Sequence, residues 1–283
     1  MEPIFDHTPL TPPLLRLDSF DLIVCQGNDA EAFLQAQLSN DVRELGVPNA
    51  QWSALLSPQG RVQALIALIR VDAQQFVLVI PHRRGTAVLD LLRRFVLRRK
   101  LQLAVDETRC LYGVEGALDV DGLIRVELPL GDERNLYLGS LENDAQPMSA
   151  GWAQRDLRAG IPWLPAAAAE RHLSHSLRLD ALPAISLKKG CYPGQEIVAR
   201  TQYLGRNKRT LCLLEAAVSD AEVGAGTQLR GGENQLAGEL IDALATTNGT
   251  LALAVISKEQ LDGVLVAEVG GTRRHQFNLV RQF

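Results

Sequence analysis

The pattern of apolar and polar positions predicts a helix over residues 28–38. Asn28 is placed as its N-cap residue, and Glu31 follows three positions later, which is the spacing of a capping box. Phe33 and Leu34 then begin a repeat that puts apolar side chains on one face of a helix. We therefore expect this helix to cover part of a core.

A second helix is predicted from Gly85 onward, because apolar residues recur at the interval of one buried stripe. The stripe comprises Val88, Leu91, Leu92, Phe95 and Val96. The expected last turn carries the cations Arg93, Arg94, Arg98, Arg99 and Lys100. Cations at a helix C-terminus are favoured by the helix dipole and usually form a solvated face, and an RNA-contacting patch is the alternative.

Strand-like segments surround these helices. In the first half they span residues 20–24, 52–56, 61–71, 74–80, 101–105, 110–114 and 123–128. A further helix is expected over 152–158, with a glycine and a proline ending it at 159–162. Six short strands separated by glycines follow after residue 209, which is typical of a small β-barrel. The fold class is therefore α+β.

Composition narrows the class of protein. The chain has 283 residues, 46% of them hydrophobic and 22% charged, which fits a globular protein of two or three domains. The net charge of −4 gives no overall attraction for nucleic acid. The start lacks a signal-peptide pattern, no apolar run is long enough for a membrane, and the four cysteines form no Cys-x-x-Cys pair. A reducing, cytoplasmic location is expected, with Cys25, Cys110 and Cys212 as small core residues.

The stretch from Leu187 to Arg200 concentrates the chemistry. Cys191 is preceded by two lysines and flanked by glycines, and Pro193 is placed as the first residue of a helix. A helix N-terminus and nearby ammonium groups lower the pKa of a thiol and also attract anions. From the spacing alone, a reactive thiolate and an unreactive surface thiol are equally supported.

The residue string adds information that the spacing does not. Lys189 through Glu196 reads Lys-Gly-Cys-Tyr-x-Gly-Gln-Glu, which resembles the signature of the YgfZ family, the folate-binding relatives of the glycine-cleavage T-protein that assist iron–sulfur enzymes. Family-like segments also occur, in family order, at 26–35, 57–62, 158–162 and 205–209. The site residues that the resemblance implies are Lys189, Cys191, Tyr192, Gly194, Gln195 and Glu196.

The resemblance implies an architecture as well. Two α+β domains and a C-terminal barrel are expected around a central channel that binds tetrahydrofolate. The domains would be 1–50 with 115–205, an inserted 51–114, and the barrel 206–283. Phe20 and Trp152 stand at the two aromatic positions that the family associates with folate, and core packing of both rings is the alternative.

The function implied is that of a folate-binding accessory protein for the maturation or repair of iron–sulfur enzymes, such as tRNA methylthiolation enzymes, with Cys191 as a redox-active or cluster-contacting thiol. One cysteine is too few to hold a cluster alone. Aminomethyl transfer to tetrahydrofolate is a second hypothesis, but T-proteins carry an Asp-Asp pair where this chain has Gln63 and Ala64, and neither can exchange a proton at neutral pH. RNA binding through Arg93–Lys100 is a third.

No metal site is expected. His172 and His175 have a spacing that would place them on one helix face, but a metal site normally needs three or four ligands. We therefore expect both to be surface histidines.

Overall fold

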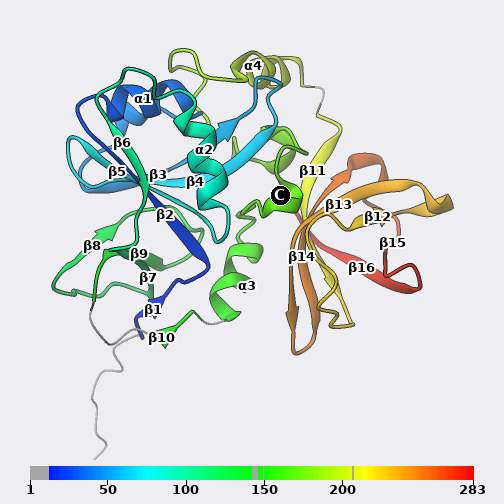
Figure 1. The fold of residues 1–283 in the computed structure, drawn as a ribbon. Coiled ribbons are helices and arrows are strands. Elements are labelled where there is room, and N and C mark those ends of the chain that lie inside the picture. Colours follow the sequence, from blue (N-terminus) through cyan, green and yellow to red (C-terminus); the bar gives the residue numbers. More distant parts are fainter. Residues whose placement is uncertain (1–12, 142–145, 149, 206) are drawn as a thin grey trace, which may run out of the picture.

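The computed structural model describes residues 13–141, 146–148, 150–205 and 207–283. Two sheets and a barrel form the molecule (Figure 1). The first sheet is antiparallel, with the order β3-β4-β5-β2-β6. Its strands are β2 (Phe20–Gln26), β3 (Asn49–Leu56), β4 (Val62–Arg70), β5 (Gln75–Pro81) and β6 (Gln102–Val105). They confirm the strands predicted for this part of the chain.

This first sheet is buried on both faces. Ala64, Ile66 and Leu68 of β4 pack under the helices α1 (Ala30–Gln37) and α2 (Gly85–Arg93). The alternate residues of the same strand, such as Leu65, face a second and larger core. The strand is apolar at nearly every position because it must fill both cores.

The second sheet has the order β10-β1-β7-β9-β8. Its strands are β1 (Leu15–Arg16), β7 (Cys110–Glu115), β8 (Leu123–Val126), β9 (Arg134–Gly139) and β10 (Gln146–Pro147). β9 lies between β7 and β8 and pairs with both, although the sequence pattern gave no strand there. The polar run before it, residues 131–135, hides the strand from a hydrophobicity pattern.

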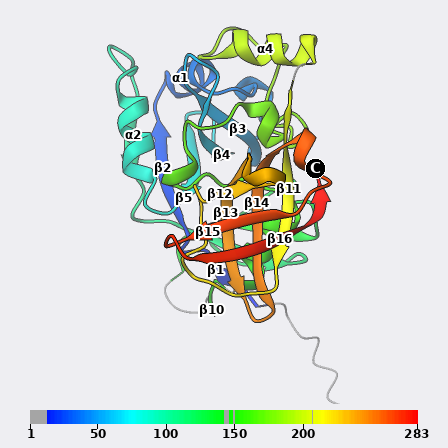
Figure 2. The ribbon, with the colours of Figure 1, turned by 90° about the vertical axis from the view of Figure 1, so that its right-hand side faces the viewer.

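The C-terminal unit is a closed barrel with the order β11-β14-β13-β12-β15-β16, which confirms the barrel expected from the six strands. Its strands are β11 (Arg209–Ala216), β12 (Gln228–Arg230), β13 (Leu236–Thr246), β14 (Gly249–Ser257), β15 (Leu265–Val269) and β16 (Arg273–Gln282). Figure 2 shows the barrel in front of the sheets, with α4 (Gln195–Leu204) along the upper edge. The helix α3 (Ala150–Arg158) packs against β13 and β14.

Short 3₁₀ turns complete the described elements: η1 (Val42–Glu44), η2 (Ala166–Ala168), η3 (Ser174–Leu177), η4 (Gly232–Asn234) and η5 (Lys258–Gln260). The larger core joins the parts, because it contains residues of both sheets together with Leu253 and Val255 from the outer side of the barrel. The barrel is therefore packed against the sheets over an apolar surface.

The first sheet takes strands from both sides of residue 50. β2 lies before residue 50 but pairs with β5 and β6, which lie after it. The strands of the barrel lie between residues 209 and 282. The division of the α+β part into domains stays a prediction.

The boundaries of α1 and α2 differ from those predicted from the sequence. α1 begins at Ala30 with Asp29, not Asn28, at the N-cap position, and the Asp29 carboxylate accepts a hydrogen bond from the Lys100 backbone N–H at 2.6 Å. α2 ends at Arg93, because successive turns over residues 94–99 bring the chain back toward β6, and Leu97 has a positive φ of 46°. Most of the basic cluster therefore lies beyond the helix.

Candidate functional site

The loop before α4 is locked onto a distant turn. Gly194, with φ of 77°, occupies the N-cap position, so the helix begins at Gln195 and Pro193 lies outside it, contrary to the prediction. A Cβ on Gly194 would lie 2.6 Å from the carbonyl oxygen of Ser57 and 2.8 Å from the Cα of Gly60. Only glycine fits here, and the contact brings together two of the segments that the sequence singled out.

Lys189 is buried and does not flank the thiol with its charge, which corrects the expectation from the sequence. Its Nζ donates to the backbone oxygens of Gln35, Leu38 and Asn40 at 2.7, 2.6 and 2.8 Å. These oxygens belong to the C-terminal end of α1 and the residues after it, where carbonyls lack helical partners. Burial lowers the pKa of Lys189 to about 8, so it remains an ammonium group at neutral pH.

Tyr192 lies beneath this lysine. The Lys189 Nζ is 5.3 Å from the centre of the Tyr192 ring, which places a cation over an aromatic face. Burial raises the pKa of Tyr192 to about 12, and its hydroxyl has no hydrogen-bond partner among the described residues. Lys189 and Tyr192 therefore anchor the loop through their buried side chains.

Cys191 is exposed between these two anchors. Cys25 and Cys212 are buried as expected, and burial raises the pKa of each to about 12, whereas Cys110 is only half-buried. Of the other signature residues, Gln195 is half-buried and Glu196 is exposed on the first turn of α4. The loop thus presents one thiol to solvent on a rigid support.

The two expected folate aromatics lie in different environments. Phe20 meets Trp163 edge to face, with ring centres 4.7 Å apart. Trp152 is 3% exposed, packs against the backbone of Gly113, and has the Arg134 guanidinium 4.5 Å from its ring centre. Trp152 is thus enclosed in the core, and Trp163, which the sequence analysis did not single out, is the partner of Phe20.

Phe20 and Trp163 line a cavity of about 150 Å³. Its wall is mostly apolar, and it lies between the ends of β2 and β5, the helix α3 and strand β13. Two carboxylates, Asp156 and Asp242, also reach it. Aromatic faces and carboxylates in one small cavity suit a flat ring system with N–H donors on its edge.

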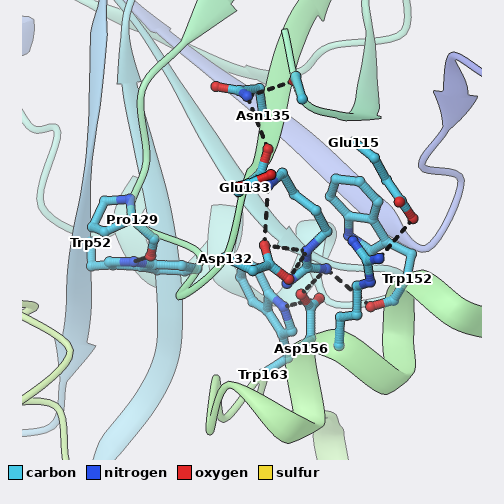
Figure 3. A network of polar contacts seen from close by, with 12 residues as sticks. Trp52, Glu115, Pro129, Asp132, Glu133, Asn135, Trp152, Asp156 and Trp163 are labelled. Carbon is cyan, nitrogen blue, oxygen red and sulfur yellow. Dashed lines mark hydrogen bonds and ion pairs between the residues drawn. The ribbon is translucent and has the colours of Figure 1, made fainter. Parts of the chain in front are cut away.

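A buried polar network fixes Asp156. Figure 3 shows Asp132, Asp156, Trp152 and Trp163 gathered in it. Arg134, whose side chain is fully buried, donates to Asp156 Oδ1 at 2.8 Å and to Asp132, and the Trp163 indole N–H donates to Asp156 Oδ2 at 3.0 Å. Burial raises the pKa of Asp156, and the Arg134 charge opposes this. The network holds the Trp163 ring in place.

Asp242 accepts fewer hydrogen bonds than Asp156 does. Its carboxylate accepts one hydrogen bond, from the Ala243 backbone N–H at 2.9 Å. Burial, reinforced by the charge of Asp156, raises the pKa of Asp242 from 3.8 to about 6. It is therefore a carboxylate that can exchange protons near neutral pH and accept further hydrogen bonds.

We expect Asp242→Asn to make the fold more stable at pH 7.5. Folded Asp242 holds its proton more tightly than the unfolded chain does, so the wild type loses stability as the pH rises from about 4 to about 6, by at most about 3 kcal/mol. Asparagine keeps the Ala243 hydrogen bond without the charge. Urea unfolding at pH 4 and 7.5 measures this, with exposed Asp180→Asn as control, and a variant less stable than the wild type at pH 7.5 contradicts it.

Gln63 and Ala64, which stand at the positions of the transferase acid, lie away from the aromatic cavity. Ala64 is buried in the core under α1 and α2. The Gln63 amide donates to a carboxylate oxygen of Glu170, and its backbone oxygen accepts from Arg84 at 2.5 Å. Neither side chain lines the aromatic cavity.

The two histidines are buried, which corrects the expectation that they lie on the surface. His175 Nε2 is 2.8 Å from Gln202 Oε1 on α4, and His172 Nε2 is 3.5 Å from Glu239 Oε1 on the barrel. His175 thus links η3 to α4, and His172 links the loop before η3 to strand β13 of the barrel. Among the described residues, no group of three or more histidines, cysteines or carboxylates could hold a metal ion.

The basic cluster is exposed. Arg93 pairs with Asp90 at 3.7 Å, and the Arg99 guanidinium lies 5.8 Å from the centre of the Phe33 ring. Phe95 is 49% exposed among these cations. RNA binding here stays a prediction. No helix within the described ranges is long and apolar enough to cross a membrane.

Comparisons with known proteins agree with this architecture. No family model matches the chain. An uncharacterized protein of Haemophilus influenzae is 29% identical over 255 residues, which are 88% of this chain and 90% of the relative. The crystal structure of glycine cleavage system aminomethyltransferase T from Bartonella henselae matches with a TM-score of 0.72 and 16% identity, over 95% of this chain and 85% of that one. The chain therefore has the fold of that aminomethyltransferase.

Proposed function

We propose that the protein binds tetrahydrofolate and acts as an accessory factor for iron–sulfur enzymes, including enzymes that modify tRNA, with Cys191 as its working thiol. The observation that carries the proposal is the Phe20–Trp163 cavity with its two carboxylates, in a chain with the T-protein fold. The YgfZ-like signature supplies the accessory role, and the structure places its cysteine in solvent.

The residues of the cavity fit a reduced pterin. The ring is flat and apolar on its faces, and its pyrimidine edge carries N–H donors that a carboxylate can accept in pairs. Phe20 and Trp163 offer the aromatic faces, and Asp242 has acceptor capacity left after its single backbone hydrogen bond. When bound, tetrahydrofolate would supply one-carbon chemistry, and these residues would orient its ring and exclude water.

The thiol has a different role in the proposal. Cys191 is exposed, so a partner can reach its sulfur, and the buried Lys189 and Tyr192 keep the loop in one position. One thiolate can contact a cluster or an oxidised sulfur of a client enzyme but cannot hold a cluster alone. The two roles, ligand binding and thiol contact, can therefore be separated by mutation.

We expect tetrahydrofolate to bind the wild type and Cys191→Ser equally, and to bind Phe20→Ala about tenfold more weakly, because an aromatic stacking partner contributes roughly 1 kcal/mol or more. Quenching of tryptophan fluorescence during titration measures this, since Trp163 lines the cavity. Absence of binding to the wild type would overturn the folate part of the proposal.

The second arm of this experiment tests the thiol. In cells that lack the native gene, Cys191→Ser is expected not to restore the methylthiolation of tRNA, whereas Cys110→Ser restores it. Full restoration by Cys191→Ser would remove the thiol from the proposal. Aminomethyl transfer and RNA binding remain alternatives that no contact of the described residues favours over this one.

A further inference from the structure

The segment that follows α2, residues 94–100, carries a cluster of exposed cations, and we call it the basic turn. Four of its seven residues are cations, in a chain whose net charge is −4: Arg94, Arg98, Arg99 and Lys100. All four are exposed, and their side chains form no hydrogen bond or ion pair with the rest of the described chain. Like charges held close together repel one another, and an anionic partner relieves this repulsion.

The tip of the basic turn is apolar. Leu97 is 86% exposed and Phe95 is 49% exposed. Leu97 also has a φ of 46°, a left-handed conformation that is unfavourable for residues with a Cβ other than asparagine and aspartate. Neither the core nor the local backbone is stabilised by a leucine at this position. Its side chain is instead available to an apolar surface outside the molecule.

The basic turn is held firmly against α1. The Asp29 carboxylate at the start of α1 accepts the hydrogen bond from the Lys100 backbone N–H, and the Arg99 guanidinium lies over the Phe33 ring. Val96 is half-buried and packs against the core under α1 and α2. A fixed backbone therefore presents the exposed side chains, which lowers the entropy that binding would cost.

The basic turn and the loop that carries Cys191 lie at opposite ends of α1. Asp29 contacts the basic turn at one end, and Lys189 binds the backbone oxygens at the other. α1 has eight residues, which makes it about 12 Å long. In Figure 2, α1, α4 and the turn that ends α2 lie toward the top of the molecule. A protein interface of ordinary size covers about 800 Å² on each partner, a patch roughly 30 Å across, so one partner can contact both places.

We infer that the basic turn is the docking surface for an acidic face of the client enzyme, and that docking there brings the client to Cys191. The inference rests on the proposed function. Guanidinium groups pair with carboxylates, which gives the charge complementarity, and Leu97 and Phe95 require an apolar surface on the partner. A nucleic-acid backbone offers anions but no such surface, so these residues favour a protein over RNA.

The probe for this test is a purified iron–sulfur tRNA methylthiolation enzyme, with tRNA alone and phosphatidylglycerol vesicles as competing anions. The wild type is expected to bind the enzyme, and more weakly at about 300 mM than at about 50 mM salt, because salt screens exposed charges. Arg98→Glu and Leu97→Asn are each expected to weaken binding about tenfold. Asparagine accepts a positive φ better than leucine does, so Leu97→Asn keeps the fold stable.

Two matched controls lie on the barrel side of the chain. Arg274→Glu changes an exposed arginine of β16, and Val218→Asn changes an apolar residue that is also exposed, and both are expected to bind the enzyme as the wild type does. The inference is overturned if the wild type does not bind the enzyme, or if Arg98→Glu and Leu97→Asn bind it as well as the controls. Binding of tRNA or vesicles alone would assign the basic turn to that anion instead.

A test in cells that lack the native gene separates the inference from the proposed function. Leu97→Asn is expected to restore less tRNA methylthiolation than the wild type at equal protein level. If both restore it equally, the docking surface is wrong and the proposed function stands. If the wild type itself restores none, the proposed function fails and the inference fails with it.

Discussion

Replacing Lys189 by methionine is expected to destabilise the protein by about 3 kcal/mol, because three carbonyl oxygens, two of them in buried contacts, would lose their donor. Methionine keeps the length of the side chain and its packing on Tyr192, so the change isolates the ammonium group. Urea unfolding at pH 7 measures the effect. Lys188 is adjacent and exposed, and Lys188→Met is expected to leave the free energy of unfolding unchanged.

The same pair of variants separates two roles for the lysine. If Lys189 acts by closing the end of α1, the pH dependence of Cys191 alkylation should be the same in wild type and in whatever fraction of Lys189→Met stays folded. A shifted alkylation profile with unchanged stability would instead show that the ammonium group acts on the thiol. The hydrogen bonds in the structure favour the first result.

Sequence reasoning succeeded where local pattern determines structure. The strands of the first sheet and of the barrel follow from runs of apolar residues bounded by glycines, and α1 follows from the spacing of Phe33 and Leu34. The role of Lys189 could not be predicted in this way. Its acceptors lie about 150 positions earlier in the chain, and only the folded structure brings them together.

The residues around the aromatic cavity were only partly singled out from the sequence. Phe20 lines the aromatic cavity together with Trp163, whereas Trp152 packs under Arg134 and is not part of that lining. The two tryptophans flank the same glycine and proline stop, so residue type alone did not distinguish them. The sequence pattern did not indicate Asp242 as a site residue, because a β-bulge in β13 determines which side of the barrel this residue faces.

The prediction of Pro193 as a first helical residue failed for a related reason. Proline suits the first turn of a helix, but Gly194 follows it in a left-handed conformation that interrupts the helical path. What selects that conformation is the turn at Ser57 to Gly60, which lies too close for a side chain. Local preference was overridden by a tertiary contact.

Gly194→Ala is therefore expected to destabilise the protein by about 3 kcal/mol or more, from the left-handed φ together with the overlap of its Cβ with Ser57 and Gly60. Two glycines of the same region resolve these causes. Gly205 has φ of 60° and open space around it, so Gly205→Ala should cost about 1 kcal/mol from the backbone alone. Gly190 has neither constraint, and Gly190→Ala should cost nothing measurable in urea unfolding. Equal losses for Gly194→Ala and Gly205→Ala would show that the contact between the signature loop and the Ser57 turn is not tight, and that the loop carrying Cys191 is held by Lys189 and Tyr192 alone.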